Sequence, residues 1–171
     1  MKARPTKKSP YITREGHEAL RREEAELWKK RRRVVKILAA AAAEGDRSEN
    51  AEYQYRKKQL REMDRRIRYL QKRIPELKVV TQAPGTPDKV FFGAWITLAA
   101  PDGDEFTYRI VGADEFNPAD NWISVDSPMA RALLGKSVED EVLVQTPTGQ
   151  RELLILEVAY TPPRKPTRST D

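Results

Sequence analysis

Two acidic residues three positions apart, Asp46 and Glu49, have the types and the spacing for metal chemistry. If a helix begins near them, this spacing places both carboxylates on one helix face. Mg²⁺ takes octahedral oxygen coordination, from a few carboxylates together with water and phosphate oxygens. Two carboxylates are therefore a poor magnesium site on their own. They become useful when they are inserted beside a metal ion that other groups already hold.

A simpler interpretation of the same two residues is helix capping. Asp46 has the residue type of an N-cap, and Glu49 has the position of its capping-box partner. Gly45, just before them, permits a sharp exit of the chain from a preceding helix. Spacing alone favours capping, and both interpretations remain open at this point.

Apolar residues recur at coiled-coil spacing on both sides of this acidic segment. After it, intervals of three and four residues connect Leu60, Met63, Ile67, Leu70, Ile74 and Leu77. Before it, seven-residue steps connect Leu20, Leu27, Val34 and Ala41. The Thr13 hydroxyl is a reasonable N-cap for the first helix. The pattern predicts an antiparallel helical hairpin about 45 Å long at about 1.5 Å per residue, with the acidic segment as its tip.

Basic residues gather on one face of the second predicted helix. Residues 56–73 contain nine basic and only two acidic side chains. At 100° per residue, one stripe away from the apolar seam is formed by Lys57, Lys58, Arg61, Arg65, Arg68 and Lys72. Such a stripe suits the phosphates of single-stranded nucleic acid, and Tyr53 and Tyr55 near the tip could stack on bases. The alternative is the solvated face of a coiled coil, although such faces normally mix charges of both signs.

Charge and composition differ between the two halves of the 171-residue chain. Residues 1–80 hold 24 Lys and Arg against 12 Asp and Glu, whereas residues 81–171 hold 8 against 14. The basic half favours a polyanion, and the acidic half is better suited to a protein surface. The sequence has no cysteine and one histidine, which excludes a thiolate metal site. With neither a signal peptide nor a long apolar run, we expect a cytoplasmic protein without a membrane segment.

The C-terminal half has the pattern of a compact sheet-plus-helix domain. An Asp-Gly turn at 102–103 separates two apolar runs, and "PTG" at 147–149 separates two more, so both are predicted hairpins. A short helix is expected at 127–136, with Ser127 as N-cap, Pro128 in its first turn and Gly135 as its stop. The expected organisation is a basic flexible tail (1–10), the hairpin (11–80), a linker (81–88), the second domain (89–160) and a disordered tail (161–171). The fold class is α+β.

Four motifs together resemble the bacterial Gre transcript cleavage factors: "GDRSENAEYQYRKKQLREMDRRIRYL", "VFFGAW", "RIVGADE" and "ISVDSPMARALLGK". The resemblance spans residues 10–160, and the basic run is closer to the GreB type than to the GreA type. It implies a coiled coil followed by an FKBP-like domain, bound at the secondary channel of bacterial RNA polymerase. The family's tip acids match Asp46 and Glu49, with Ser48 between them. Its polymerase-binding motif matches Asp126, Ser127 and Pro128, where a simple helix start is the competing interpretation.

The resemblance further implies how such a factor acts. The tip acids would help to hold the second catalytic Mg²⁺ of polymerase, which then hydrolyses the 3′ end of backtracked nascent RNA. The protein would be a monomer and not an enzyme by itself, and the basic stripe would guide extruded RNA. Two other classes stay open: a channel binder that inhibits polymerase, which a tip lacking competent acids would favour, and a peptidyl-prolyl isomerase, which rests on fold analogy alone.

Overall fold

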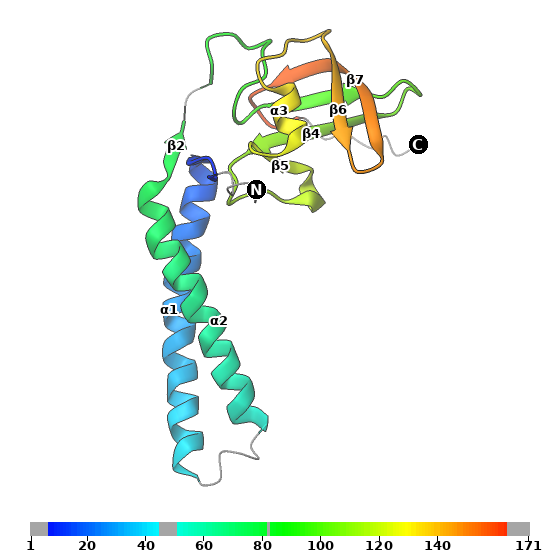
Figure 1. The fold of residues 1–171 in the computed structure, drawn as a ribbon. Coiled ribbons are helices and arrows are strands. Elements are labelled where there is room, and N and C mark those ends of the chain that lie inside the picture. The colour runs from blue at the N-terminus through cyan, green and yellow to red at the C-terminus, as the bar shows by residue number, and fades with distance from the viewer. Residues whose placement is uncertain (1–6, 45–50, 82, 164–171) are drawn as a thin grey trace, which may run out of the picture. The chain divides into compact units, whose positions relative to one another are not determined.

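The computed structural model describes residues 7–44, 51–81 and 83–163, and the chain divides into two compact units. The helical unit comprises residues 17–77. The sheet unit combines the chain up to Gly16 with the chain from Lys78 onward. Figure 1 labels the helices α1, α2 and α3 and most of the strands. The fold class predicted from the sequence, a helical hairpin followed by a sheet-plus-helix domain, is confirmed.

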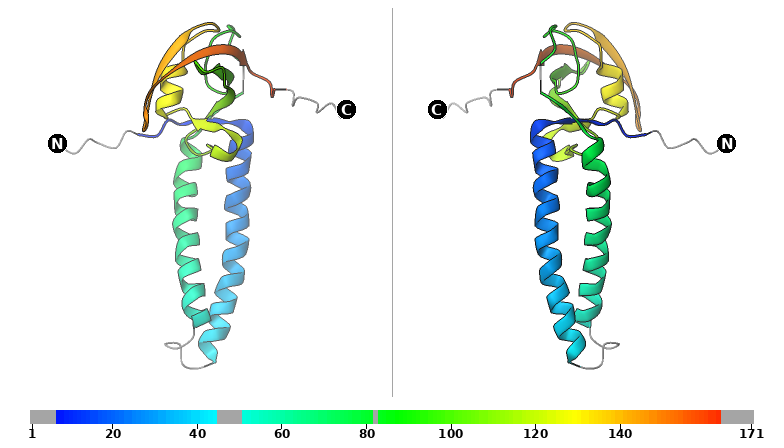
Figure 2. Two further views of the ribbon diagram at one scale, coloured as in Figure 1. Left: turned by 90° about the vertical axis from the view of Figure 1, so that its right-hand side faces the viewer. Right: turned by 90° about the vertical axis from the view of Figure 1, so that its left-hand side faces the viewer.

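The helical unit consists of α1 (Arg14–Ala43) and α2 (Ala51–Arg73). The two helices run antiparallel and lie side by side in both views of Figure 2. Its apolar seam is made of the buried residues Leu20, Val34, Met63, Ile67 and Leu70, as the heptad spacing predicts. A seam of this kind stabilises the hairpin because apolar side chains from both helices leave water together.

The second helix ends earlier than the apolar spacing indicates. Ile74–Glu76 form a 3₁₀ turn, η1, and Leu77 is already extended, so the last two predicted seam residues lie beyond α2. The physical reason is Pro75, which has no N–H to donate and whose ring crowds the preceding turn. Arg73 is 7% exposed at this point, and its guanidinium lies 3.7 Å from the Glu76 carboxylate.

Both ends of the range expected for the hairpin, 11–80, are strands rather than helices. β1 (Tyr11–Thr13) and β2 (Lys78–Val80) pair in parallel, with Tyr11 opposite Lys78. The chain before them is also held, because Lys78 N donates to Pro10 O at 2.8 Å. Residues 9 and 10 therefore belong to the folded sheet unit, which differs from the expected flexible tail ending at residue 10. A strand of three residues is too short for a sequence pattern to predict the pairing of β1 with β2.

A five-stranded sheet forms the rest of this unit, in the order β5-β4-β3-β7-β6. Its strands are β3 (Trp95–Ala99), β4 (Glu105–Val111), β5 (Trp122–Ser124), β6 (Glu141–Thr146) and β7 (Gly149–Ala159). The two predicted hairpins are confirmed as the antiparallel pairs β3–β4 and β6–β7, whereas β4 and β5 are parallel. A 3₁₀ turn, η2 (Pro118–Asp120), precedes β5.

The short helix α3 (Pro128–Leu133) begins and ends as the sequence predicts. Ser127 is its N-cap, with Oγ accepting from Ala130 N at 3.2 Å, and Pro128 lies in the first turn. Gly135 follows with φ of 80°, a conformation that L side chains rarely adopt. These caps satisfy backbone groups that a six-residue helix would otherwise leave without partners.

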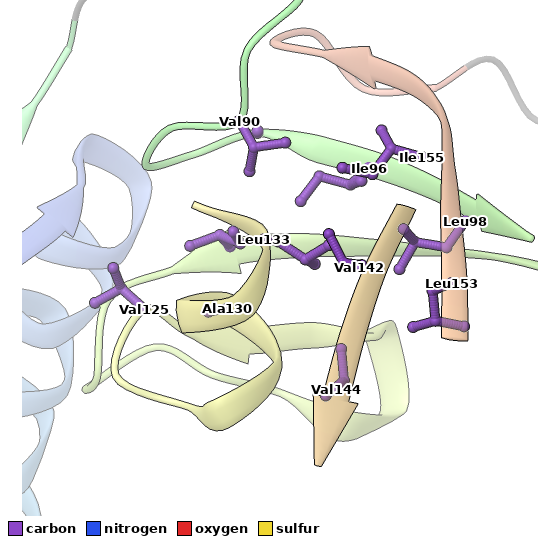
Figure 3. Close-up of a cluster of buried hydrophobic side chains, with 12 residues drawn as sticks. Val90, Ile96, Leu98, Val125, Ala130, Leu133, Val142, Val144, Leu153 and Ile155 are labelled. Carbon is purple, nitrogen blue, oxygen red and sulfur yellow. The ribbon is translucent and has the colours of Figure 1, made fainter. Parts of the chain in front are cut away.

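The core of the sheet unit lies between α3 and one face of the sheet, as Figure 3 shows. Its buried side chains are Val90, Ala94, Ile96, Leu98, Ile110, Val125, Ala130, Leu133, Val142, Val144, Leu153 and Ile155. Because side chains alternate along a strand, Ile96 and Leu98 enter this core while Trp95 and Thr97 lie on the other sheet face. The core thus fixes α3 and the loops at its ends.

Candidate functional site

The predicted tip residues Asp46, Ser48 and Glu49 lie outside the described residues, in the connection between the end of α1 and the start of α2. The helices nevertheless bracket that connection closely, since α1 ends at Ala43 and α2 begins at Ala51. The geometry of the two carboxylates therefore stays a prediction, and the choice between capping and metal binding stays open.

All six residues of the predicted basic stripe lie on α2 and are exposed. Two have contacts within their own helix: Lys57 Nζ lies 5.5 Å from the centroid of the Tyr53 ring, and Arg68 Nε donates to Asp64 O at 3.3 Å. Among the residues that the structure describes, none of the six forms an ion pair with a carboxylate. The stripe therefore presents uncompensated positive charge to solvent.

Other cations of the same unit are neutralised across the seam. Arg31 Nε lies 2.6 Å from Asp64 Oδ1. Arg66 binds Glu23 through two bonds of 2.7 and 3.0 Å, the bidentate geometry in which a guanidinium matches a carboxylate best. The Asp64 and Glu23 carboxylates thus pair the two helices with each other, and neither is an ion-pair partner of a stripe residue.

A hollow of about 420 Å³ lies along one flank of the helical pair, beside the stripe. Lys30 and Leu27 of α1 line it together with Tyr55 and Lys58 of α2. Tyr55, which the sequence suggests as a base-stacking residue, is 61% exposed and has the Arg56 guanidinium 5.7 Å from its ring centroid. Lys30, which lines this hollow, was not among the predicted basic stripe residues, although it belongs to the basic run "KKRRR" at 29–33.

The predicted polymerase-binding residues follow β5 and lead into α3. Ser127 and Pro128 start that helix, so the competing structural interpretation holds for these two residues. Asp126 is half-buried, and both of its carboxylate oxygens accept hydrogen bonds from Ser9: Oδ2 from Ser9 N at 2.9 Å and Oδ1 from Ser9 Oγ. The three residues span the turn after β5 and the first position of α3, and Pro128 is exposed; we call this segment the loop Asp126–Pro128.

A second carboxylate, that of Glu115, holds the N-terminal strand of the same unit. Its Oε2 accepts from Thr13 N and from Gly112 N, both at 2.8 Å, and its Oε1 accepts from the Thr13 hydroxyl. Thr13 Oγ1 in turn accepts from Gly16 N at 3.1 Å, which confirms the predicted N-cap of α1. The fit at Gly112 is close, because a Cβ there would lie 2.3 Å from Tyr11 O.

An arginine lies between two tryptophans on the outer face of the sheet. The guanidinium of Arg109 is 3.9 Å from the centroid of the Trp95 ring and 4.9 Å from that of Trp122. Burial lowers the pKa of Arg109, while the negative charges of Glu15 and Glu115 act in the opposite direction. The side chain nevertheless stays protonated, since the ordinary pKa of arginine lies far above neutral pH. The three stacked groups join β3, β4 and β5.

The described residues contain neither a metal-binding cluster nor a membrane-spanning helix. No group of three or more His, Cys, Asp or Glu side chains in them could hold a metal ion. No helix in the same part of the chain has the length and apolarity needed to cross a membrane.

Comparisons with known proteins cover both units. The family model "Transcription elongation factor, N-terminal" matches residues 10–79, and "Transcription elongation factor, GreA/GreB, C-term" matches residues 84–160. The chain is 56% identical over 156 residues to the transcription elongation factor GreB of Yersinia pestis, covering 91% of each chain. It is 53% identical over 155 residues to that of Pseudomonas aeruginosa, covering 90% of this chain and 92% of the relative.

A crystal structure of Gfh1 from Thermus aquaticus is 23% identical, with a TM-score of 0.42, covering 90% of this chain and 99% of the other. The family assignment depends on the sequence matches, which extend over nearly the whole chain at more than half identity. The chain belongs to the GreA/GreB family of transcription elongation factors.

Proposed function

We propose that the protein binds bacterial RNA polymerase at its secondary channel and stimulates cleavage of the 3′ end of backtracked nascent RNA. Polymerase would supply the catalytic centre, and the protein would be an activator without hydrolytic activity of its own. It would act as a monomer, in the cytoplasm where bacterial transcription takes place. Membership of the GreA/GreB family supports the transcriptional part of this proposal.

The observation that carries the RNA part is the outward face of α2. Six exposed cations lie there without an acidic partner among the described residues, although acids close to the seam are paired with Arg31 and Arg66. Opposite charges on a solvated coiled-coil face stabilise the helix, whereas the like charges of this stripe repel one another until a polyanion binds and neutralises them. We assign this stripe to the extruded RNA strand, with exposed Tyr55 available for stacking.

The tip acids would complete the reaction site only inside polymerase. Asp46 and Glu49 offer two carboxylates, too few oxygen ligands for Mg²⁺ by themselves, so the ion would be shared with polymerase groups. Mg²⁺ in a two-metal site supplies stabilisation of the attacking and leaving oxygens. The residues of this chain would add negative charge at that ion, and Ser48 lies between them. Capping of α2 by the same residues is compatible with this role.

The loop Asp126–Pro128 would bind polymerase from the sheet unit. Support comes from its construction: the loop is fixed on one side by α3 and on the other by Ser9, while Pro128 is exposed. A rigid, partly exposed loop loses little conformational freedom when it binds, which favours affinity.

The proposal is tested by adding the full-length protein to stalled polymerase complexes that carry end-labelled, backtracked RNA and Mg²⁺. We expect shortened transcripts that polymerase can extend again when nucleotides are supplied. The matched control is the protein incubated with the same RNA in the absence of polymerase, where no cleavage is expected. Unchanged RNA length in the complexes, with demonstrated binding of the protein, would refute the cleavage function.

A further inference from the structure

The N-terminal arm, residues 7–13, runs along the sheet unit and contacts three acidic side chains of it. Lys8 Nζ lies 4.0 Å from Asp114 Oδ1, whose side chain is 5% exposed. Ser9 binds Asp126, and Thr13 binds Glu115. Each acid belongs to the connections that follow β4 or β5, two neighbouring parallel strands. The arm is therefore an integral part of the surface that presents Asp126.

Ser9 fixes the carboxylate of Asp126 with two hydrogen bonds, one to each oxygen. A carboxylate held at both oxygens cannot rotate about its terminal bond without losing one of them. The backbone of the same loop is also tied, since Asp126 N donates to Ser124 Oγ at 3.1 Å and Ser127 N donates to Ser124 O at 2.9 Å. Orientation of the acid thus comes from Ser9, and orientation of the loop comes from Ser124.

We infer that Ser9 is a positioning residue for polymerase binding: it holds the Asp126 carboxylate in the orientation in which the loop Asp126–Pro128 binds polymerase. The inference rests on the function proposed above for that loop. Ser9 itself would act through Asp126 rather than through the catalytic reaction. The partner group that this geometry fits is a cationic or N–H donor on the polymerase surface.

The geometry favours positioning over competition between Ser9 and polymerase. An ionised carboxylate offers about four lone-pair sites, and Ser9 occupies two of them. A polymerase donor can therefore bind Asp126 while both contacts to Ser9 remain. An acid that is already oriented loses less freedom on binding, so its complex is tighter than that of a freely rotating side chain.

Removing the Ser9 hydroxyl should leave the rest of the arm in place. The Ser9 N–H still donates to Asp126, Pro10 O still accepts from Lys78 N, and Thr13 still binds Glu115. Ser9→Ala is therefore a local change at one oxygen of Asp126. A matched control is Thr13→Val, which also removes from the arm a hydroxyl bound to a carboxylate, that of Glu115.

The experiment measures the Kd of labelled full-length variants for stalled polymerase complexes, together with the RNA cleavage rate at saturating protein. For Ser9→Ala we expect polymerase binding to weaken about five- to tenfold in Kd. This is less than the full effect of losing a hydrogen bond to a charged group, because the Ser9 N–H still holds Asp126. The saturated cleavage rate should be unchanged. Ser9→Thr, which keeps a hydroxyl, should restore the Kd, and Thr13→Val should lower the thermal unfolding midpoint while leaving the Kd nearly unchanged.

Several results would overturn the inference. An unchanged Kd for Ser9→Ala would show that the orientation of Asp126 is immaterial, and a tighter Kd would show that Ser9 competes for it. An equal loss from Thr13→Val would assign the effect to the arm as a whole. The double variant Asp126→Ala with Pro128→Ala distinguishes failure of the Ser9 inference from failure of the proposed docking loop. If this variant weakens binding and Ser9→Ala does not, only the inference fails, whereas normal binding by both refutes the proposed docking loop.

Discussion

The basic stripe on α2 yields a quantitative prediction about RNA. We consider replacing three of its exposed residues, Lys57, Arg61 and Arg65, with glutamine in one variant. Each residue is exposed and has no carboxylate partner among the described residues, so the change removes charge without breaking an ion pair there. RNA extruded over a longer segment should lose more from this variant than RNA extruded over a short one, because it brings more phosphates to the stripe.

The magnitude follows from counterion release. Each lost phosphate contact lowers the salt slope of single-strand engagement by about 0.7, so three contacts lower it by about 2.1. Between about 50 and 200 mM salt, the wild-type advantage on long RNA should therefore shrink about 20-fold relative to the variant. The assay compares cleavage rates on polymerase complexes with short and long backtracked RNA across this salt range, below saturation. Subtracting the short-RNA slope removes the contribution of polymerase docking.

A matched control is the triple replacement of Lys29, Arg32 and Lys36 with glutamine. These residues are exposed cations of α1 outside the stripe, and the variant loses the same charge. An equal effect of the two triple variants would mean general attraction rather than a guide on α2. The reasoning is refuted if the α2 variant loses the same activity on short and long RNA with no change in salt slope.

Three further predictions concern stability. Glu115→Ala removes three hydrogen bonds to a charged group and should lower the free energy of unfolding of the sheet unit by about 3 kcal/mol in urea denaturation. Its control, Glu105→Ala at an exposed strand position, should change this free energy by less than about 0.5 kcal/mol. Similar values for the two variants would contradict a stabilising role of the Glu115 hydrogen bonds. Leu70→Ala, at a fully buried seam position, should cost about 2–5 kcal/mol of helical-unit stability by circular dichroism, while Val35→Ala, 39% exposed, should cost little. Burial raises the pKa of Tyr160, so its phenol should ionise above the ordinary tyrosine range and its contribution to stability should be lost as pH rises above about 10. An ultraviolet titration in which Tyr160→Phe removes no high-pH absorbance change would refute this assignment.

Much of the fold could be predicted because its signals are local. The heptad spacing indicates the seam, the Asp-Gly turn indicates the β3–β4 hairpin, and Ser127 with Gly135 marks both ends of α3. The end of α2 was also visible in principle, because Pro75 interrupts the helix even where the apolar spacing continues.

The contacts that join distant segments could not be predicted in this way. β1 pairs with β2 across more than sixty residues, and Glu115 binds Thr13 across about a hundred. The residue types in these two contacts are common in strands and loops, so no periodicity or motif in the sequence indicates which residue pairs with which. A motif in the sequence marks Asp126 as a predicted polymerase-binding residue, whereas no motif indicates that Ser9 binds its carboxylate.

The most direct test of the central claim concerns the tip acids. Asp46→Asn and Glu49→Gln each remove a charge that we assign to the shared Mg²⁺ while retaining much of the capability to cap α2. With polymerase saturated by each variant and Mg²⁺ limiting, we predict that the RNA cleavage rate falls by about 100-fold or more, the scale expected for loss of a group that stabilises the transition state. The Kd for polymerase should stay within about twofold, well under the tenfold change that 1.4 kcal/mol would produce. Cleavage by both variants at the wild-type rate would contradict the claim and leave helix capping as the only role of these residues.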